Sequence, residues 1–186
     1  MKTIVTAVCP VLDTERLHLR APQRGDIEAV VRHVGDPRVA FKTTRIPHPY
    51  RLSDAIEWFD AMEQSDETAF AIELKSQPGQ LVGLIALHPR EDRVSAEIGY
   101  WLGVPYWRHG YMTEALRGVL RHAFEEQGLL YVTANHMAGN PASGRVMQKA
   151  GMKFENIVAG GLSREGVAHD KVNYGLFADE WRALHC

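Results

Sequence analysis

Residues 96–124 read AEIGYWLGVPYWRHGYMTEALRGVLRHAF, which we interpret as a strand, a short loop and the start of a long helix. Apolar residues from Met112 to Phe124 recur at i, i+3, i+4, i+7, i+8, i+11 and i+12, a spacing that predicts an amphipathic helix over 111–127. Gly128 is expected to end this helix, and the apolar run over 93–102 predicts the preceding strand. This strand and helix are the clearest pair of elements in the sequence.

The turn between them has the features of an anion site. The first backbone N–H groups of a helix lack internal partners, and the helix dipole places partial positive charge there. Gly110 lies inside the turn, and Arg108 and His109 would add positive charge. A pyrophosphate fits such a turn. A tight turn without a ligand is the alternative interpretation at this position.

The composition is that of a globular protein with a substantial core. The chain has 186 residues, of which 45% are hydrophobic and 24% are charged, which fits one domain over 1–186 with an N-terminal arm over 1–13. The formal net charge of −2 argues against nucleic acid or an anionic membrane as the main partner. Cys9 and Cys186 cannot form a disulfide framework, which favours a reducing compartment and a cytoplasmic protein. The longest apolar run, 81–87, is far shorter than the roughly 20 residues that a bilayer requires.

The rest of the chain divides into short elements. We expect strands over 16–20, 68–74, 81–87, 93–102, 130–135, 153–158 and 168–177, and helices over 26–34, 53–64, 111–127 and 141–149. The order β-α-α-β-β-β-α-β-α-β-β fits neither a doubly wound sheet nor a β-sandwich. It predicts an α/β (α+β) fold with a mixed central sheet of about seven strands and helices on both faces.

Capping and turn residues mark the expected boundaries. Ser53 is expected to cap the second helix, with Ile56, Phe59 and Met62 on its inward face. Asn140 is the expected N-cap of the helix over 141–149. The expected connections are a proline-containing loop over 36–52, a turn over 77–79 and a glycine-rich loop over 159–167.

Several blocks of sequence occur together in a family order. They are Thr14-Glu-Arg-Leu-His-Leu-Arg20, Ala96-Glu-Ile-Gly-Tyr100, Tyr106-Trp-Arg-His-Gly-Tyr-Met-Thr-Glu-Ala115, Asn140-Pro-Ala-Ser-Gly-Arg-Val-Met-Gln-Lys-Ala-Gly151, and a closing segment with His169-Asp170 and Glu180-Trp181. Together they resemble the GNAT superfamily of acyl-CoA-dependent N-acetyltransferases, and more narrowly its ribosomal-protein N-terminal (serine/alanine) acetyltransferase branch. That branch has Tyr-Trp-Gly-Lys-Gly-Tyr-Ala-Thr-Glu-Ala in the third block. The resemblance covers nearly the whole chain and implies the GNAT fold.

The resemblance also implies acetyl-CoA as the co-substrate. In that fold the strand ending at Leu102 diverges from the strand ending near Asn135, and the pantetheine arm lies in the gap. A backbone N–H near Leu102 would polarise the thioester carbonyl, and those over 108–113 would bind the pyrophosphate. The residues implied in binding are Leu102, Val104, Arg108, His109, Gly110, Tyr111, Met112, Thr113, Asn135 and Asn140.

Two residues depart from the family pattern. Met112 stands where Gly or Ala is usual in the phosphate-binding motif, although its backbone N–H is still available. Met147 stands where many members carry a Tyr that is proposed to protonate the leaving thiolate, so that role does not transfer. These departures leave open a non-catalytic acyl-CoA-binding module as an alternative to an enzyme.

Two residues are candidates for the chemistry. Glu97 shares a strand face with Ser95, Gly99 and Trp101, and we expect it to accept the proton of the amine directly or through water. A structural glutamate is the alternative. Ser143 lies one turn into the helix over 141–149 and would donate to the departing sulfur, unless it is an ordinary solvent-facing serine.

The acceptor follows less directly from the residues. Contacts are expected from 36–52 and 159–167, with Trp58 and Trp107 at the border of the acceptor site. A protein N-terminal amine is favoured; a small amine such as a polyamine, an antibiotic or an amino-acid-like toxin is the alternative. No spacing of His or Cys matches a metal site, so no metal is expected. Nucleic acid is not expected either, because of the net charge. Members of this family are often dimers, which leaves a homodimer open.

Overall fold

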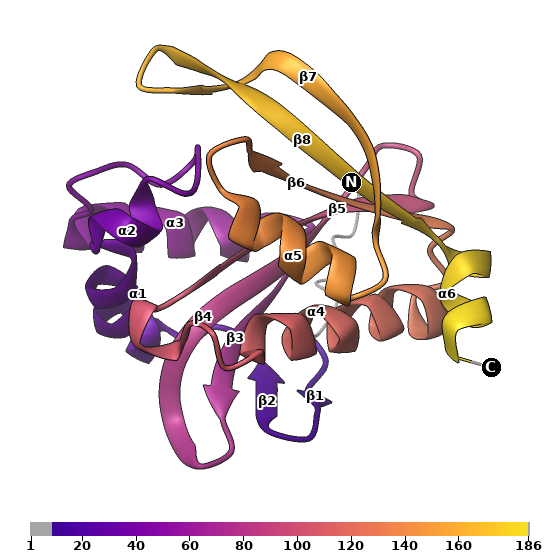
Figure 1. The fold of residues 1–186 in the computed structure, drawn as a ribbon. Helices are drawn as coiled ribbons and strands as arrows, with labels where there is room; N and C mark the ends of the chain where they lie inside the picture. Colours follow the sequence, from indigo (N-terminus) through magenta and orange to yellow (C-terminus); the bar gives the residue numbers. More distant parts are fainter. Residues whose placement is uncertain (1–8, 186) are drawn as a thin grey trace, which may run out of the picture.

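The computed structural model describes residues 9–185, which form an eight-stranded mixed sheet covered by helices on both faces (Figure 1). The strands are β1 (Leu12–Asp13), β2 (Leu17–Arg20), β3 (Thr68–Leu74), β4 (Gln77–Pro89), β5 (Ser95–Leu102), β6 (Tyr131–Met137), β7 (Lys153–Arg164) and β8 (Val167–Phe177). Their spatial order is β1-β2-β3-β4-β5-β6-β8-β7. β5 and β6 pair in parallel, and the other neighbours pair in antiparallel. The predicted mixed sheet is confirmed, with β1 as an added strand.

The helices divide between the two faces of the sheet. They are α1 (Ile27–Val34), α2 (Pro37–Ala40), α3 (Leu52–Glu63), α4 (Tyr111–Arg121), α5 (Pro141–Lys149) and α6 (Ala178–His185), with short turns η1 (Arg24–Asp26) and η2 (Val104–Tyr106) and a π-helical extension of α4, η3 (His122–Glu126). The main core joins α4 and α5 to one face of the sheet. A second cluster joins α1 and α3 to the other face, through Ala71 and Leu81. Successive side chains of a strand point to opposite faces, so the same strands contribute to the hydrophobic clusters on both faces of the sheet.

The sheet opens between β5 and β6. Their parallel register runs from Ser95 opposite Tyr131 to Ile98 opposite Ala134 and stops there. Both strands continue, to Leu102 and Met137, without pairing with one another. The divergence predicted for these two strands is confirmed. It places the ends of β5 and β6 and the first turns of α4 and α5 around one opening (Figure 1).

The helix predictions hold over most of their length. α5 has the predicted bounds, and α4 with η3 spans nearly all of the predicted helix before Gly128, whose φ is +69°. The prediction for Ser53 was wrong: α3 begins one residue earlier, and Asp54 Oδ2 accepts from Arg51 N–H over 2.6 Å. Ile56 is 39% exposed instead of inward, because Ala55 occupies the buried stripe with Phe59.

Three predicted connections contain regular structure. The segment 36–52 begins with α2, whose first turn is capped by the Asp36 carboxylate accepting from Arg38 N–H over 2.9 Å. Residues 77–79 belong to β4, and the turn lies at 75–76 instead. The glycine-rich segment 159–167 is mostly strand, because it pairs with β8. Its glycines lie where the pairing register shifts, between Val158 and Leu162. Of the predicted N-terminal arm, residues 1–8 lie outside the described part of the chain, as does Cys186, and Leu12–Asp13 form β1.

Glu114 ties the N-terminal segment to the start of α4. Its Oε1 accepts from Thr14 Oγ1 over 2.6 Å and from Arg16 N–H over 2.7 Å, while Oε2 accepts from Arg16 Nε over 2.7 Å. Arg16 in turn donates from Nη1 to the His109 carbonyl over 3.0 Å. Burial raises the pKa of Glu114, but the hydrogen bonds from Thr14 and Arg16 outweigh it and hold the pKa below the ordinary 4.5.

We expect Glu114→Gln to lower the free energy of unfolding at pH 7 by about 1–3 kcal/mol, since hydrogen bonds to a charged group are lost. A carboxyl with a lowered folded-state pKa stabilises above its unfolded pKa, and this contribution disappears as the pH falls through the folded value. The difference between variant and wild type should therefore shrink below pH 4.5. Urea unfolding from pH 3 to pH 8 measures it. Glu63→Gln, which alters an exposed ion pair with Arg24, is the control and should change stability little. A constant difference across this pH range would contradict the prediction.

Candidate active site

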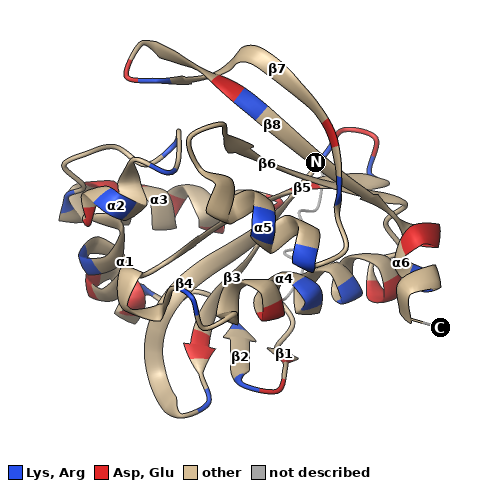
Figure 2. Ribbon diagram, in the orientation of Figure 1, with Lys and Arg blue, Asp and Glu red and all other residues tan. Residues whose placement is uncertain are grey.

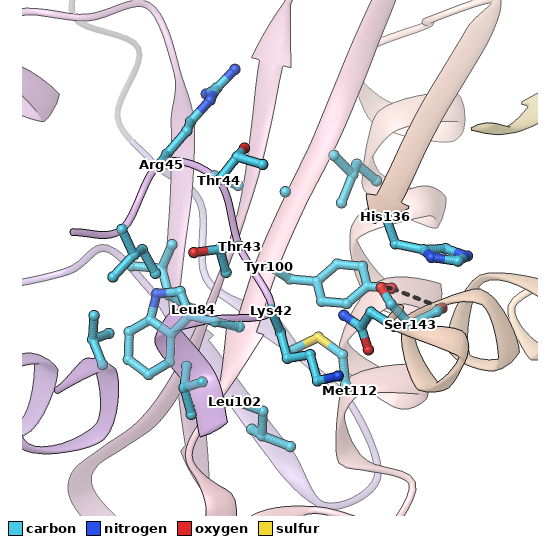
Figure 3. A pocket seen from close by; sticks show the side chains of 18 of the residues that line it. Lys42, Thr43, Thr44, Arg45, Leu84, Tyr100, Leu102, Met112, His136 and Ser143 are labelled. Atoms are coloured by element: carbon cyan, nitrogen blue, oxygen red, sulfur yellow. Dashed lines mark hydrogen bonds between the residues drawn. The ribbon is translucent and has the colours of Figure 1, made fainter. Parts of the chain in front are cut away.

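The opening between β5 and β6 leads into one cavity of about 1580 Å³ (Figure 3). Its walls come from the first turns of α4 and α5, the ends of β5 and β6, the outer half of β4, α3 and the segment 42–47. The segments that sequence analysis assigned to the co-substrate and to the acceptor thus share a continuous space. The site therefore has two sides, one at the α4 and α5 starts and one beneath α3.

The start of α4 has the backbone geometry expected of an anion cradle. Arg108 and Gly110 have φ values of +67° and +82°, which turn the chain sharply before the helix. Glu114 N–H donates to the Gly110 carbonyl over 3.0 Å, so the N–H groups of the first three helical residues precede the intrahelical ladder. Arg108, Gly110, Tyr111, Met112 and Thr113 all line the cavity. A diphosphate at this position would meet free donors and the positive end of the helix dipole.

Basic side chains surround the cradle. Arg145 and Lys149 of α5 line the same cavity, and Figure 2 shows Lys and Arg on α4 and α5 where these helices lie side by side. Behind the cradle, the Arg16 guanidinium lies 4.8 Å from the centre of the Tyr111 ring. These charges favour a polyanion at the mouth of the cavity.

Two of the predicted binding residues point elsewhere. His109 does not line the cavity; its ring stacks on Tyr111 at 5.4 Å and its carbonyl accepts from Arg16. Val104 begins η2 and also does not line the cavity. For 108–113 the resemblance implies binding through backbone N–H groups, so the role of His109 stays a prediction.

The end of β5 presents backbone donors to the gap. Gly103 N–H donates to the Val82 carbonyl of β4 over 2.9 Å, and N–H directions alternate along a strand. Leu102 N–H therefore faces away from β4, toward the gap. Leu102 and Asn135 both line the cavity. This geometry is suited to polarising a thioester carbonyl, as the sequence predicted.

Ser143 has a partner that the sequence did not indicate. The Tyr100 hydroxyl lies 2.8 Å from Ser143 Oγ and donates to the Ser143 carbonyl over 3.2 Å (Figure 3). Burial raises the pKa of Tyr100 far above its ordinary value, more than the Ser143 hydrogen bond lowers it. Tyr100 thus stays protonated at neutral pH. Strand parity places Tyr100 on the face of β5 opposite Glu97, but nothing in the sequence pairs it with α5.

Asn140 and Met147 occupy different environments on α5. Asn140 stands at the N-cap position, yet its side chain makes no capping hydrogen bond, contrary to the predicted capping role. Its carbonyl accepts from Ser143 N–H over 3.1 Å, and the residue lines the cavity, so its amide is left for a ligand. Met147 is 1% exposed and belongs to the main core.

Glu97 lies on the cavity wall and is partly exposed. Its carboxylate is 27% exposed, and Oε2 lies 3.8 Å from both Arg90 Nη2 and Lys171 Nζ. Two cations thus balance this carboxylate. The alternating faces predicted for β5 are confirmed, because Ala96 and Ile98 enter the main core while Trp101 packs against the α1 and α3 side.

The acceptor side is formed mainly by one of the two predicted segments. Residues 42–47 line the cavity, as do Trp58 and Trp107, whereas the segment 159–167 contributes Leu162. The segment 42–47 is held in place from both ends. Lys42 Nζ donates to the Gly139 carbonyl over 2.9 Å, and Arg164 Nη1 donates to the carbonyls of Ala40, Thr43 and Ile46 over 2.6–2.9 Å.

A family model described as the acetyltransferase (GNAT) domain matches residues 16–153. This chain belongs to the GNAT acetyltransferases. The family assignment makes the chain an N-acetyltransferase that uses acetyl-CoA and an amine acceptor. The cradle, the β5 donors and the gap fit acetyl-CoA through its diphosphate and its pantetheine arm.

Individual relatives support this assignment. The chain is 38% identical over 105 residues to a putative ribosomal N-acetyltransferase, YdaF, of Bacillus subtilis, covering 55% of this chain and 57% of that protein. It is 26% identical over 178 residues to the N-acetyltransferase YoaA of the same organism, covering 90% of this chain and 96% of that protein. The match to YdaF thus spans little more than half of that relative.

Solved structures share the fold. A GNAT-family acetyltransferase from Bacillus anthracis superposes with a TM-score of 0.83 at 25% identity, covering 91% of this chain and 99% of that chain. A ribosomal alpha-N-protein acetyltransferase in complex with coenzyme A has a TM-score of 0.80 at 16% identity, covering 92% of this chain and 99% of that chain. A spermidine N-acetyltransferase from Vibrio cholerae with CoA and spermine has a TM-score of 0.78 at 17% identity, covering 91% of this chain and 99% of that chain. At these identities the last two show the fold alone.

Two further observations concern metal ligands and membrane-spanning helices. Within residues 9–185, no group of three or more His, Cys, Asp or Glu side chains is arranged to hold a metal ion. Over the same residues, none of the helices has the length and apolar character needed to cross a membrane.

Proposed function

We propose that this GNAT enzyme transfers the acetyl group of acetyl-CoA to the N-terminal α-amine of a protein, as in the ribosomal-protein branch. The size of the cavity carries the proposal. About 1580 Å³ exceeds the roughly 300–1,000 Å³ of ordinary small-molecule sites, which leaves room for an extended peptide beside the pantetheine arm. The similarity to a relative named as a ribosomal N-acetyltransferase supports the same class of acceptor.

A small amine is the second candidate, and a specific feature favours it. Asp54 and Glu57 of α3 line the acceptor side, where carboxylates would attract a polyamine. Lys42, Arg45 and Lys171 line the same cavity and oppose a polycation. The mixed charge therefore favours a peptide, whose first residues carry a single positive charge at the amine.

The reaction needs a polarised carbonyl and a protonated leaving group. Leu102 N–H would polarise the thioester carbonyl, and the backbone of 110–113 would hold the diphosphate. The amine attacks the carbonyl carbon, the C–S bond breaks, and the thiolate takes a proton. Ser143 Oγ is our candidate donor for that proton, and the Tyr100 hydroxyl, 2.8 Å away, holds the serine hydroxyl in place. Asn140 and Asn135 would bind the pantetheine arm.

We expect Ser143→Ala to lower kcat about 10- to 100-fold with little change in the acetyl-CoA Kd, because proton donation acts only as the C–S bond breaks. Tyr100→Phe should lower kcat less, since the serine hydroxyl itself remains. Steady-state kinetics with calorimetric binding of acetyl-CoA measures both effects. Ser53→Ala, an exposed serine on α3, is the matched control. An unchanged kcat in Ser143→Ala would remove Ser143 from the mechanism.

The acceptor is tested by acetyl-CoA-dependent release of free thiol from a panel of amines. The panel contains peptides beginning with Ser, Ala or Met, then spermidine, an aminoglycoside and amino acids. Turnover on a peptide class supports the proposal and defines its specificity. Turnover on spermidine or another small amine alone would overturn it in favour of the second candidate.

Cytoplasmic location and a homodimer remain predictions. The first rests on the two cysteines, of which Cys9 is a free thiol whose burial raises its pKa to about 11. Such a thiol is poorly suited to oxidation chemistry. Light scattering of the purified chain measures the oligomeric state, and fractionation of the source cells measures the location.

A further inference from the structure

Glu67 and His88 form a pair on the acceptor wall. His88 Nδ1 is buried and lies 2.7 Å from Glu67 Oε1, as an ion-pair contact without the angles of a hydrogen bond, although the side chains are 23% and 31% exposed. Glu67 precedes β3 and His88 lies near the end of β4, and both line the cavity. A carboxylate beside Nδ1 favours the tautomer with its proton on that nitrogen. Nε2 is then a free proton acceptor.

The free nitrogen faces the point where the sheet opens. A Cβ built on Gly99 would lie 3.1 Å from His88 Nε2, so the imidazole covers the bare backbone of this residue. Gly99 directly follows Ile98, the last β5 residue that pairs with β6. The absence of a side chain at Gly99 makes the room that the ring occupies. Nε2 therefore lies over the start of the gap assigned to the thioester, on the side of α3 and the acceptor.

Glu97 is less free to take a proton than His88. It is the register partner of His88, but two cations lie 3.8 Å from its carboxylate. The Glu97 carboxylate is thus already held between two cations. His88 has a carboxylate behind it instead, which stabilises the imidazolium that proton transfer would create.

We propose that His88 is the general base that takes the proton from the acceptor amine, and that Glu67 is the positioning residue that holds its ring. The ammonium R–NH₃⁺ gives one proton to Nε2, and its nitrogen forms a bond to the thioester carbonyl carbon. The C–S bond then breaks and the thiolate leaves with a proton as CoASH. The amide nitrogen loses its second proton, which replaces the one that Ser143 gave to the thiolate, and His88 returns its proton to water. The net products are the acetylated amine, CoASH and one H⁺.

This inference goes beyond the proposed function, because it applies to any primary amine that reaches the cavity. The charges near His88 are Glu67, Asp66 and Arg45 on the α3 side and Glu97, Arg90 and Lys171 on the β5 and β8 side. Together they carry three negative and three positive charges. The carboxylate nearest to His88 is that of Glu67, so the pair itself dominates the local field.

The test compares His88→Gln with wild type, using an amine from the panel that wild type acetylates. At pH 7 we expect kcat/KM to fall about 100-fold, the lower end for loss of a general base. The acetyl-CoA Kd and the thermal midpoint should stay the same. The deficit should shrink toward pH 9–10, where solvent removes the amine proton. Glu67→Gln should lower kcat/KM about 10-fold and move its acid limb to lower pH.

His18→Gln is the matched control, because His18 Nδ1 also lies beside a carboxylate, Asp13, at 3.1 Å but outside the cavity. It should leave the pH profile unchanged. If His88→Gln does not fold, Gly99→Ala crowds Nε2 while keeping the histidine, and it should lower kcat/KM about 10-fold at unchanged acetyl-CoA Kd. Two outcomes would overturn the proposal and assign the base to Glu97. In one, kcat/KM of His88→Gln still falls at low pH as in wild type. In the other, only Glu97→Gln loses that fall.

A binding measurement separates this proposal from the question of the acceptor. Binding of an adduct in which CoA and a peptide are joined through the acetyl group should shift the His88 Nε2 signal in an NMR spectrum of the imidazoles. The His18 signal should stay in place. An unmoved His88 signal with bound adduct would overturn the assignment of the base. Turnover on spermidine with peptides inactive would refute the proposed acceptor and leave the His88 test intact.

Discussion

Thr113→Glu is expected to weaken acetyl-CoA binding by more than 100-fold while leaving the protein folded. Thr113 lies at the third position of α4 and lines the cavity at the anion cradle. A carboxylate there would stand close to the diphosphate. A charge pair about 5 Å apart repels by about 3 kcal/mol at an effective dielectric of about 20. That energy corresponds to about 200-fold in Kd.

The same substitution should not harm the helix. An acidic residue in the first turn interacts favourably with the helix dipole by about 0.3–1 kcal/mol, so the thermal midpoint should hold or rise slightly. Calorimetric titration with acetyl-CoA and a thermal melt measure the two effects. Thr113→Gln, of similar size and without charge, is the control and should bind within a few-fold of wild type. Equal losses in the two variants would point to steric obstruction and contradict the electrostatic explanation.

Arg164→Ala is expected to raise the KM of the acceptor at least 10-fold and to lower the free energy of unfolding by about 3 kcal/mol. The Arg164 side chain is 6% exposed, and it supplies hydrogen bonds to three carbonyls of the segment 40–46. Its guanidinium also lies 4.8 Å from the centre of the Phe41 ring. Each buried carbonyl left without a donor costs about 1–3 kcal/mol, and opening of the segment to water would relieve part of that cost. The acceptor wall would thereby lose its shape.

The acetyl-CoA Kd should change little in Arg164→Ala, because the anion cradle is formed by α4 and α5. Steady-state kinetics over both substrates, with urea unfolding, tests this separation. Arg38→Ala is the control: Arg38 lies in α2, just before this segment, but is 66% exposed and pairs with its neighbour Asp36. Arg164→Lys should recover part of the stability, since an ammonium reaches fewer of the three carbonyls. An unchanged acceptor KM in Arg164→Ala would show that the acceptor does not contact this wall.

Much of the fold was predictable because its signals are local. The apolar spacing over α4, the Asn140-Pro141 start of α5 and the alternation in β2 each require only a few consecutive residues. The anion cradle was predictable for the same reason, since a glycine before a helix start forms it. The predictions failed where pairing overrode local preference. The glycine-rich segment 159–167 reads as a loop alone, but hydrogen bonds to β8 make most of it strand.

Residue patterns alone predicted the order of the main elements and the GNAT family, and they indicated which backbone donors could bind acetyl-CoA. The side chains that meet in the cavity became apparent only in the folded chain. Tyr100 and Ser143 are 43 residues apart, and Arg164 reaches carbonyls more than 110 residues before it. Glu67 and His88 meet because β3 and β4 are neighbours in the sheet. Such contacts depend on strand register and helix placement over long separations, and no local pattern of residues encodes them.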